Sequence, residues 1–596
     1  MFSVRSTSRR RDWRSSALRA TFVVLGGVVV FRLFILQVVS AGYYQQLSSN
    51  QHGFYEELFA SRGDIFVRDW VDGKEYLAAT TERRALVYAD VRHVENAEAT
   101  AKALATILRI PIQLTVPDPA SAALPEATEY ETLLARLSKK DDPYEPLARD
   151  IDEDTAERVK DANLAGIGIS YEEARFYPEK NIGGHIFGFL GVDSEGTKIG
   201  QYGIEGFEQD FLAGVNGFIE SQADTAGQWI GVGTRTLSSA VDGGDLLLTI
   251  DRTIQYTACK YLAEGVREFD ADGGSIVILE PSTGRVIAMC NTPDYDPNDY
   301  GNVESISVFN NGAIMSSYEP GSVMKPLVMA AAIDSGAIAP TTTFDDPGEV
   351  QVDDRTIRNS DLKAHGIQTM TQVLENSLNT GMVFVMRKMG GEKMATYLEN
   401  FGLGKVTGIE LDTEVPGTLE SLKDGAEIYY ATASYGQGVT TTTLQMASAY
   451  AALANGGMLM QPYIIEERRY DGGAVVPTTP RAVRQVISQK TATTIGAMMV
   501  SVIENGHGSR AAVPGYYIAG KTGTAQVASS EGGYQTDHTI ATFAGFGPVE
   551  NPQFAMVVTL DRPRSTEWAE SSSALIFHNV AEFLLEYLQV APVRDI

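Results

Sequence analysis

The chain has 596 residues, 44% of them hydrophobic and 21% charged, which is typical of folded globular protein and long enough for several domains. Its formal net charge of -28 argues against nucleic acid or an anionic lipid surface as the main ligand of the bulk of the chain. The seven histidines are scattered, and Cys259 and Cys290 have no ligand-like spacing. We therefore expect no zinc site, no disulfide framework and no cofactor.

The N-terminal residues differ in charge from the rest of the chain. Six arginines and a single acid precede Thr21, and the apolar run Ala20 to Val39 is about long enough to span a bilayer, interrupted by Arg32 and Gln37. We predict a cytoplasmic basic tail at residues 1–19 and a transmembrane helix at residues 20–39, with the remainder outside the cytoplasmic membrane. The alternatives are a buried core helix and a signal peptide cleaved after Ala41. The apolar run is longer than a usual signal core, which favours the anchor.

Residues 43–240 alternate short strand-like runs with polar turns and hold no nucleophile beside a base. This pattern predicts a β-rich spacer or pedestal. Three stretches in it are dense in glycine, aromatic and charged residues: "SRGDIFVRD" from Ser61, "RFYPEKNIGGHIFGFLG" from Arg175 and "GQYGIEGFEQDFLAGVNG" from Gly200.

Strand-like segments stand at both ends of the following region, residues 250–592. "GGSIVILEPSTGRVIAMC" (273–290) and "TIATFAGFGPVENPQFAMVVTLD" (539–561) each predict a hairpin, and "GYYIAGKTGTAQV" (515–527) predicts a further strand. The residues between them are mainly helical in pattern. The sequence therefore predicts a mixed α/β domain, with one sheet assembled from both ends and a helical insert.

The stretch "YEPGSVMKPLVMAAAIDSG" (318–336) places Lys325 one helical turn after Ser322. One interpretation is ordinary: Ser322 caps a helix, and Lys325 extends to water. However, Leu327 to Ile333 has almost no polar face, so the helix reads as buried, and Lys325 has little room to reach solvent. A buried lysine loses proton affinity, and a neutral amine beside a serine can act as its base.

Three short motifs occur in order: Ser322-x-x-Lys325, Ser377-Leu378-Asn379 and Lys521-Thr522-Gly523-Thr524. With these motifs, the basic tail and anchor, the pedestal stretches and "YGQGVTTTTLQMASAYAALANGG" (435–457), almost the whole chain resembles the class B penicillin-binding proteins. Its Glu-Pro-Gly-Ser context is similar to the division-specific peptidoglycan D,D-transpeptidase; an elongation-specific enzyme is the alternative within the class. The resemblance implies a transpeptidase domain with an antiparallel sheet, preceded by a pedestal of the dimerisation type.

The resemblance also implies a role for each motif. Ser322 would attack the D-Ala-D-Ala amide of a peptidoglycan stem peptide and hold it as an acyl-enzyme, with Lys325 taking the serine proton. Ser377 would relay a proton to the leaving amine, and Asn379 would hold the substrate amide.

The third motif would bind the substrate beside an edge strand. Lys521 and Thr522 would hold its carboxylate, and Gly523 would leave room for its backbone. The backbone N–H groups of Ser322 and Thr524 would form the oxyanion hole. Implied partners are stem peptides, β-lactams, a membrane glycan polymerase of the shape, elongation, division and sporulation family, and other division proteins.

Three other functions compete with this one. A β-lactamase is suggested by Glu375, which with Leu378 and Asn379 fits the pattern of a deacylating loop, but the same residues form the second motif. A bifunctional polymerase would need a glycosyltransferase acid motif, which the pedestal lacks. A non-enzymatic scaffold or β-lactam sensor would not need all three motifs. Two departures from the family concern Leu378, where serine or aspartate is common, and the C-terminal "STEWAESSSALIFHNVAEFLLEYL", which lacks paired glycines.

Overall fold

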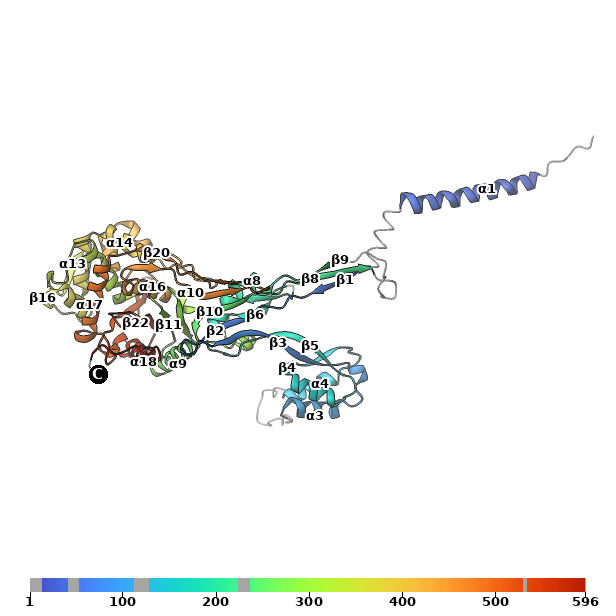
Figure 1. Ribbon diagram of the computed structural model, residues 1–596, viewed down its shortest axis with the longest axis horizontal. Helices are drawn as coiled ribbons and strands as arrows, with labels where there is room; N and C mark the ends of the chain where they lie inside the picture. Colours follow the sequence, from blue (N-terminus) through green and yellow to red (C-terminus); the bar gives the residue numbers. More distant parts are fainter. Residues whose placement is uncertain are drawn as a thin grey trace, which may run out of the picture. The chain divides into compact units, whose positions relative to one another are not determined.

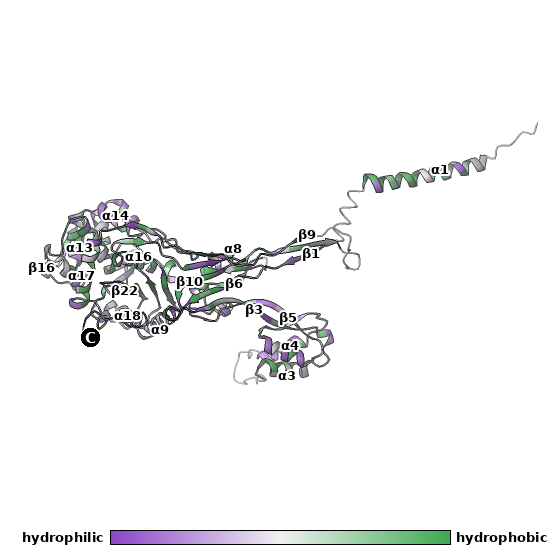
Figure 2. Cartoon of the chain, in the orientation of Figure 1, coloured by the Kyte–Doolittle hydropathy of each residue, from purple (hydrophilic) through white to green (hydrophobic). Residues whose placement is uncertain are grey.

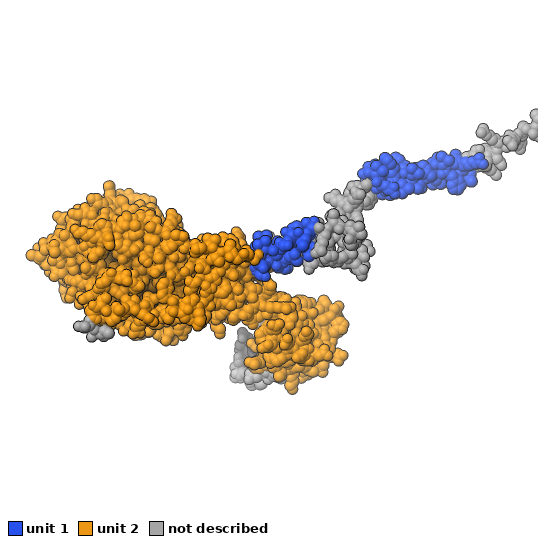
Figure 3. Space-filling model, in the orientation of Figure 1, with its two compact units in different colours: residues 1–61, 214–242 blue, residues 62–213, 243–596 orange. Residues whose placement is uncertain are grey.

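The computed structural model describes residues 13–40, 53–111, 128–194, 196–222, 236–528, 533–566 and 568–594. The chain divides into two compact units, coloured separately in Figure 3. Unit 1 comprises residues 1–61 and 214–242, and unit 2 comprises residues 62–213 and 243–596. Residues 43–240, predicted as one pedestal, thus contribute to both units.

Unit 1 holds an apolar helix and a small sheet. Helix α1 (Trp13–Phe34) continues as a π-helical turn (Ile35–Val39), and apolar residues cover most of its length (Figure 2). Within the described residues, Ala17–Val39 is the one helical segment long and apolar enough to cross a membrane. The sheet pairs β1 (Gly53–Leu58), β8 (Gly217–Gln222) and β9 (Thr236–Ser238) in antiparallel order.

Unit 2 begins with a mixed sheet in which β2 lies between β10 and β3. Its strands are β2 (Ile65–Arg68), β3 (Glu75–Ala89), β4 (Glu145–Ile151), β5 (Ile167–Phe176), β10 (Asp245–Asp251), β18 (Ile465–Arg469) and β19 (Val475–Pro477). The far ends of β3, β4 and β5 carry helices α3 (Ala97–Leu108), α4 (Glu129–Leu137) and α5 (Glu153–Asp161), which share an apolar core with them. The pedestal therefore contains helices in addition to the predicted strands.

Short elements connect this sheet to the rest of unit 2. They are η2 (Val91–His93), α6 (Gly184–Phe187), β6 (Phe189–Val192), β7 (Lys198–Gln201), α7 (Gly203–Phe207), α8 (Gln209–Ala213), η3 (Pro297–Asn302), η4 (Ile306–Phe309) and α10 (Gly312–Met315).

A five-stranded antiparallel sheet supports the region of the three motifs (Figure 1). Its order is β12 (Val286–Thr292), β11 (Gly273–Leu279), β23 (Phe554–Asp561), β22 (Tyr534–Gly547) and β21 (Ala519–Ala528), so β21 is an edge strand. Side chains alternate between the two faces of a strand. On β11, Ile276 and Ile278 join the core formed with α9 (Arg252–Glu268) and α18 (Ser573–Tyr587), whereas Val277 and Leu279 join the core on the opposite face.

The helical insert between β12 and β21 covers that opposite face. It contains η5 (Gly321–Met324), α11 (Lys325–Asp334), α12 (Met370–Glu375), α13 (Asn379–Met389), α14 (Gly391–Asn400), α15 (Glu427–Ala433), α16 (Thr443–Ala454) and α17 (Gln489–Asn505). Smaller elements of the insert are β13 (Thr343–Asp346), β14 (Glu349–Val352), β15 (Arg355–Arg358), β16 (Gly366–Thr369), η6 (Glu420–Asp424), β17 (Met458–Met460), β20 (Ala482–Gln485) and η7 (Ser509–Ala511). Beyond the insert, η8 (Ala569–Ser571) lies between β23 and α18 in the chain.

The predicted architecture of this region is confirmed. Both predicted hairpins form, and the strand predicted at 515–527 begins four residues later, as β21. Of the apolar run Leu327 to Ile333 that was predicted to be buried, Leu327 to Ala332 are fully buried and Ile333 at its end is partly buried. This helix fills the interior because it has no polar face to turn toward water.

The expectation for the two cysteines was wrong. Cys259 on α9 and Cys290 on β12 form a disulfide across 31 residues of sequence. Their spacing gave no signal, because the bond depends on α9 packing against the sheet next to β12 rather than on sequence distance.

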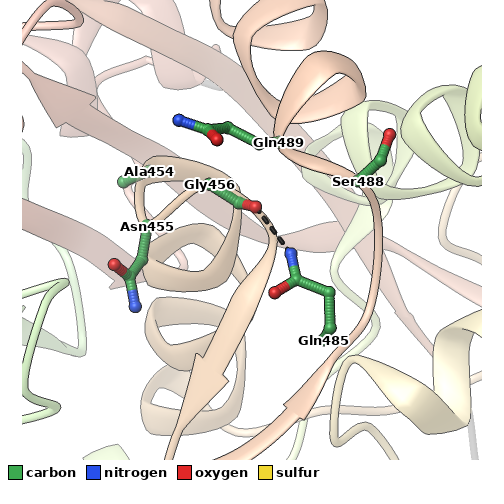
Figure 4. A pocket seen from close by; sticks show the side chains of 6 residues that line it. All are labelled: Ala454, Asn455, Gly456, Gln485, Ser488 and Gln489. Carbon is green, nitrogen blue, oxygen red and sulfur yellow. Dashed lines mark hydrogen bonds between the residues drawn. The ribbon is translucent and has the colours of Figure 1, made fainter.

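Figure 4 shows a hollow on unit 2. Its lining comprises Ala454, Asn455, Gly456, Gln485, Ser488 and Gln489. The Gln485 amide spans it with a 2.7 Å hydrogen bond to the carbonyl of Gly456. None of the predicted site residues contributes to this hollow.

Candidate active site

The turn that carries Ser322 is fixed by contacts on two sides. Gly321 has a left-handed φ of 59° and donates its N–H to the carbonyl of Gly436 at 3.0 Å. A Cβ atom at Gly321 would lie 3.3 Å from the side chain of Ala525 on β21, so the turn passes close to the edge strand. The Tyr450 hydroxyl, buried on α16, donates to the carbonyl of Val323 at 2.8 Å. The nucleophile candidate therefore lies on a backbone held by helix, loop and strand.

Lys325, the first residue of α11, is completely buried. Its Nζ donates to three oxygens: the Ser377 carbonyl at 2.6 Å, Ser377 Oγ at 3.1 Å and Asn379 Oδ1 at 2.8 Å. Ser377 Oγ in turn lies 3.1 Å from Ser322 Oγ. The hydrogen bonds thus run from Lys325 through the Ser377 hydroxyl to Ser322.

The second motif lies where α12 ends and α13 begins. Ser377 has a left-handed φ of 53°, and this turn directs the chain from one helix to the next. Asn379 is the first residue of α13, while Leu378 is 1% exposed within the hydrophobic core. The departure from the family at Leu378 therefore places an apolar side chain in an apolar environment and leaves both polar neighbours at the site.

The third motif lies on the edge strand β21. Lys521 is fully buried, and its Nζ donates to the carbonyl of Thr522 at 3.2 Å. A Cβ atom on Gly523 would stand 2.8 Å from the carbonyl of Pro320, too close for any side chain. Thr524 Oγ1 accepts a hydrogen bond from the N–H of Ala569 at 3.2 Å. The unusual C-terminal segment therefore contacts the motif directly.

Burial makes the charged ammonium form of both lysines less favourable than it is in water. Burial, together with the nearby Lys521 ammonium group, lowers the pKa of Lys325 well below its usual value. Burial also lowers the pKa of Lys521 to about 7, partly opposed by the carboxylate of Glu570. The site can therefore hold a neutral amine at Lys325 near neutral pH, as a general base requires.

The carboxylate of Glu375 is bound elsewhere. Its Oε1 accepts a 2.5 Å hydrogen bond from Ser501 Oγ on α17. Its backbone carbonyl accepts from the N–H of His507. These contacts hold Glu375 between α12 and α17, which disfavours the role of a deacylating base beside Ser322.

Glu319, three residues before Ser322, was noted in the sequence only as part of the Glu-Pro-Gly-Ser context and was given no role in the site. Its Oε1 accepts from the Gly438 N–H at 2.9 Å, and its Oε2 accepts from the Tyr534 hydroxyl at 3.1 Å. Burial raises the pKa of this carboxyl group. Glu319 thus connects the nucleophile turn to a loop and to β22, and only the arrangement in space reveals it.

Comparison with known proteins agrees with this geometry. Residues 274–582 match the family model of the penicillin-binding protein transpeptidase domain, and residues 57–248 match that of the penicillin-binding protein dimerisation domain. The chain is 31% identical over 587 residues to stage V sporulation protein D of Bacillus subtilis, covering 97% of this chain and 87% of that protein. It is 32% identical over 581 residues to the penicillin-binding protein PbpB of Mycolicibacterium smegmatis, covering 94% and 88%.

Solved structures show the same fold. Penicillin-binding protein 3 of Mycobacterium tuberculosis, complexed with aztreonam, superposes with a TM-score of 0.67 at 25% identity, covering 90% of this chain and 98% of that one. Penicillin-binding protein 2X of Streptococcus thermophilus gives a TM-score of 0.72 at 22% identity, covering 90% and 81%. The chain belongs to the penicillin-binding protein transpeptidase family. It is an enzyme of the serine-type transpeptidase class.

Proposed function

We propose that the protein is a peptidoglycan D,D-transpeptidase that cross-links stem peptides through an acyl-enzyme on Ser322. The single observation that carries this proposal is the chain of hydrogen bonds from buried Lys325 through Ser377 to Ser322. In this reaction Ser322 Oγ bonds to the carbonyl carbon of the penultimate D-Ala. The amide C–N bond breaks, and the terminal D-Ala leaves with a proton. An amine of a neighbouring stem then takes the acyl group and frees Ser322.

The contacts favour a relay for the serine proton. A hydroxyl both donates and accepts, and its hydrogen rotates to suit its partners. With Lys325 neutral, Ser322 can donate to Ser377 Oγ while Ser377 donates to Lys325 Nζ, so attack transfers the proton along two short steps. This route differs from the direct transfer that the sequence predicted. The same relay, run in reverse, would supply the proton of the leaving amine.

Lys521, Thr522 and the backbone of β21 would hold the acyl donor. A substrate carboxylate beside Lys521 would stabilise the protonated amine, and the protonated amine would in turn strengthen binding of the carboxylate. A Cβ atom on Gly523 would meet Pro320 and Val323, so this glycine lets the turn that carries Ser322 pack against β21. We assign the oxyanion hole to the backbone N–H groups of Ser322 and Thr524.

We further propose that β-lactams acylate Ser322 and that the enzyme acts at the division septum. The first is supported by the structural relatives solved with aztreonam and ampicillin. The second rests on the Glu-Pro-Gly-Ser context of residues 319–322, which is similar to the division-specific enzyme. A relative from Mesostigma viride, named peptidoglycan D,D-transpeptidase FtsI homolog and 29% identical over 590 residues, supports the transpeptidase activity. The arginine-rich tail before α1 supports an anchor with its N-terminus in the cytoplasm, with residues 43–240 as pedestal and 250–592 as catalytic domain. A membrane glycan polymerase would supply the glycan strands.

The intact mass of the protein after exposure to a penicillin tests the acyl-enzyme. We expect one stable adduct on the wild type, located on Ser322 by peptide mapping, and none on Ser322→Ala. Since Glu375 is held by Ser501, the adduct should persist after free drug is removed. Rapid turnover of penicillin that Glu375→Gln abolishes would favour a β-lactamase instead. No adduct on a folded protein would favour the scaffold.

A further inference from the structure

Asp346, at the end of β13, is a buried carboxylate to which the mechanism above assigns no role. It is 2% exposed. Its Oδ1 accepts from Thr380 Oγ1 at 2.6 Å and from the Gly348 N–H at 3.0 Å. Its Oδ2 accepts from Asn359 Nδ2 at 2.8 Å and from the His365 N–H at 3.0 Å. A carboxylate offers about four lone-pair positions, so these four donors use its full capacity.

Two of these donors flank Asn379. Thr380 is the next residue in the chain, and it is 1% exposed. Arg358, the residue before Asn359, accepts a 2.9 Å hydrogen bond from Asn379 Nδ2 through its carbonyl. Asn359 Oδ1 accepts from the Thr380 N–H at 3.3 Å, which closes the network. Asp346 therefore holds both backbone segments between which the Asn379 side chain lies.

This arrangement fixes which way the Asn379 amide faces. A carbonyl accepts only, so the Arg358 carbonyl requires the NH2 group of Asn379 on its side. Asn379 Oδ1 must then face the opposite way, where it accepts from Lys325 Nζ at 2.8 Å. If the Arg358 carbonyl moved, the amide would lose the partner that sets its orientation.

We propose that Asp346 is a positioning residue that orients Asn379 toward Lys325 and the substrate amide by holding Asn359 and Thr380. This inference rests on the proposed role of Asn379. Burying a carboxylate is costly unless donors replace its water, and here four donors of the protein do so. The segment from β13 to β15 is thus tied to the start of α13 through the side chain of Asp346.

A double-mutant cycle in the full chain, in detergent micelles, separates this role from general support of the fold. Asp346→Asn replaces one acceptor oxygen with an NH2 group that faces two donors. We expect it to lower the second-order rate of acylation by a fluorescent penicillin about tenfold or more. In the Asn379→Ala background the same change should cost no more than about threefold, because Asp346 then has no amide to orient. An equal factor in both backgrounds would overturn the proposal.

Further variants keep the test decisive. Asp345, the exposed neighbour on the same strand, provides the matched control: Asp345→Asn should stay within about twofold of wild type. Should Asp346→Asn not fold, Thr380→Val takes its place in the cycle, and Thr380→Ser should restore the rate by returning the hydroxyl. Wild-type acylation by Asn379→Ala would remove the path by which Asp346 acts and so refute the inference. The Ser322→Ala adduct assay tests the proposed function separately.

Discussion

Two clusters of buried cations in unit 2 differ in what surrounds them. In the pedestal, Arg62 and Arg175 both contact the fully buried carboxylate of Glu205, at 2.5 Å and 2.7 Å. At the active site, Lys325 and Lys521 are equally buried, and their hydrogen bonds go to neutral oxygens. In the first cluster each cation contacts a carboxylate, and Asp64 lies 4.0 Å from Arg175 as a second one, whereas the second cluster contains two lysines that repel each other.

The pKa values follow this difference. Burial alone would raise the pKa of Glu205, but the guanidinium groups of Arg175 and Arg62 outweigh it and hold that pKa below its usual value. The two lysines have their pKa values lowered by burial. A paired buried cation stays charged and supports the fold, while an unpaired one becomes able to exchange a proton near neutral pH. The arginines of the pedestal therefore form a structural cluster, whereas the lysines of the active site are suited to proton transfer.

The largest expected effect comes from Lys325→Met, which removes the amine but keeps most of the volume. We expect acylation by penicillin to fall by about 10²- to 10⁴-fold, because the serine loses its base. Methionine removes the cost of burying the amine but leaves the Ser377 carbonyl and Asn379 Oδ1 without their donor, so we expect a change in thermal stability that is small beside the loss of acylation. Stopped-flow acylation and thermal unfolding measure the two effects. An unchanged acylation rate would show that Lys325 supports the fold, as the pedestal arginines do, and is not the base.

The pedestal cluster should respond in the opposite way. Glu205→Gln leaves two buried guanidinium groups without their carboxylate, and we expect it to cost about 3–5 kcal/mol of stability. Chemical denaturation of the full chain in micelles measures this loss. The exposed pair Glu420–Lys423 is the control, since Glu420→Gln should cost about 0–1 kcal/mol. Similar losses of stability in both variants would show that burial does not strengthen the ion pairs of Glu205.

The same cluster has a defined pH dependence. Because the folded pKa of Glu205 lies below its usual value of 4.5, its stabilisation is present above that pH and disappears as pH falls through the folded pKa. Thermal stability of the wild type should thus decrease below about pH 4.5, and the decrease should be smaller in Glu205→Gln. An identical acid profile for both proteins would exclude Glu205 as a source of acid sensitivity.

The smallest effect should appear in the pH profile of acylation. Lys325 must be neutral and Lys521 charged, so the rate should rise with pH through the pKa of Lys325 and fall above about 7. Because arginine remains charged, Lys521→Arg should remove the alkaline fall, giving a gain of about tenfold relative to wild type one unit above that pKa. The acylation rate at each pH is divided by the maximum rate of the same protein, and the resulting profiles of wild type and variant are compared. An alkaline fall that persists in Lys521→Arg would assign it to another group.

The sequence alone determined the elements whose residues carry a local pattern. The run from Leu327 to Ile333 has almost no polar face, which predicted a buried helix. The two hairpins follow from β-rich runs around turn residues, and the order of the three motifs indicated the family. These predictions succeeded because each depends on residues close together in the chain.

Only the tertiary structure decided how distant side chains meet. The disulfide between Cys259 and Cys290 requires α9 to lie against β12, and the route from Lys325 to Ser322 through Ser377 requires the turn between α12 and α13 to face η5. In the sequence nothing distinguishes Asp346 from other acidic residues, and only the fold brings four donors from the region between β13 and α13 to its carboxylate. The lowered pKa values of Lys325 and Lys521 likewise arise from burial by segments that are far apart in the sequence. Desolvation depends on every element packed around a group and not on its neighbours in the chain.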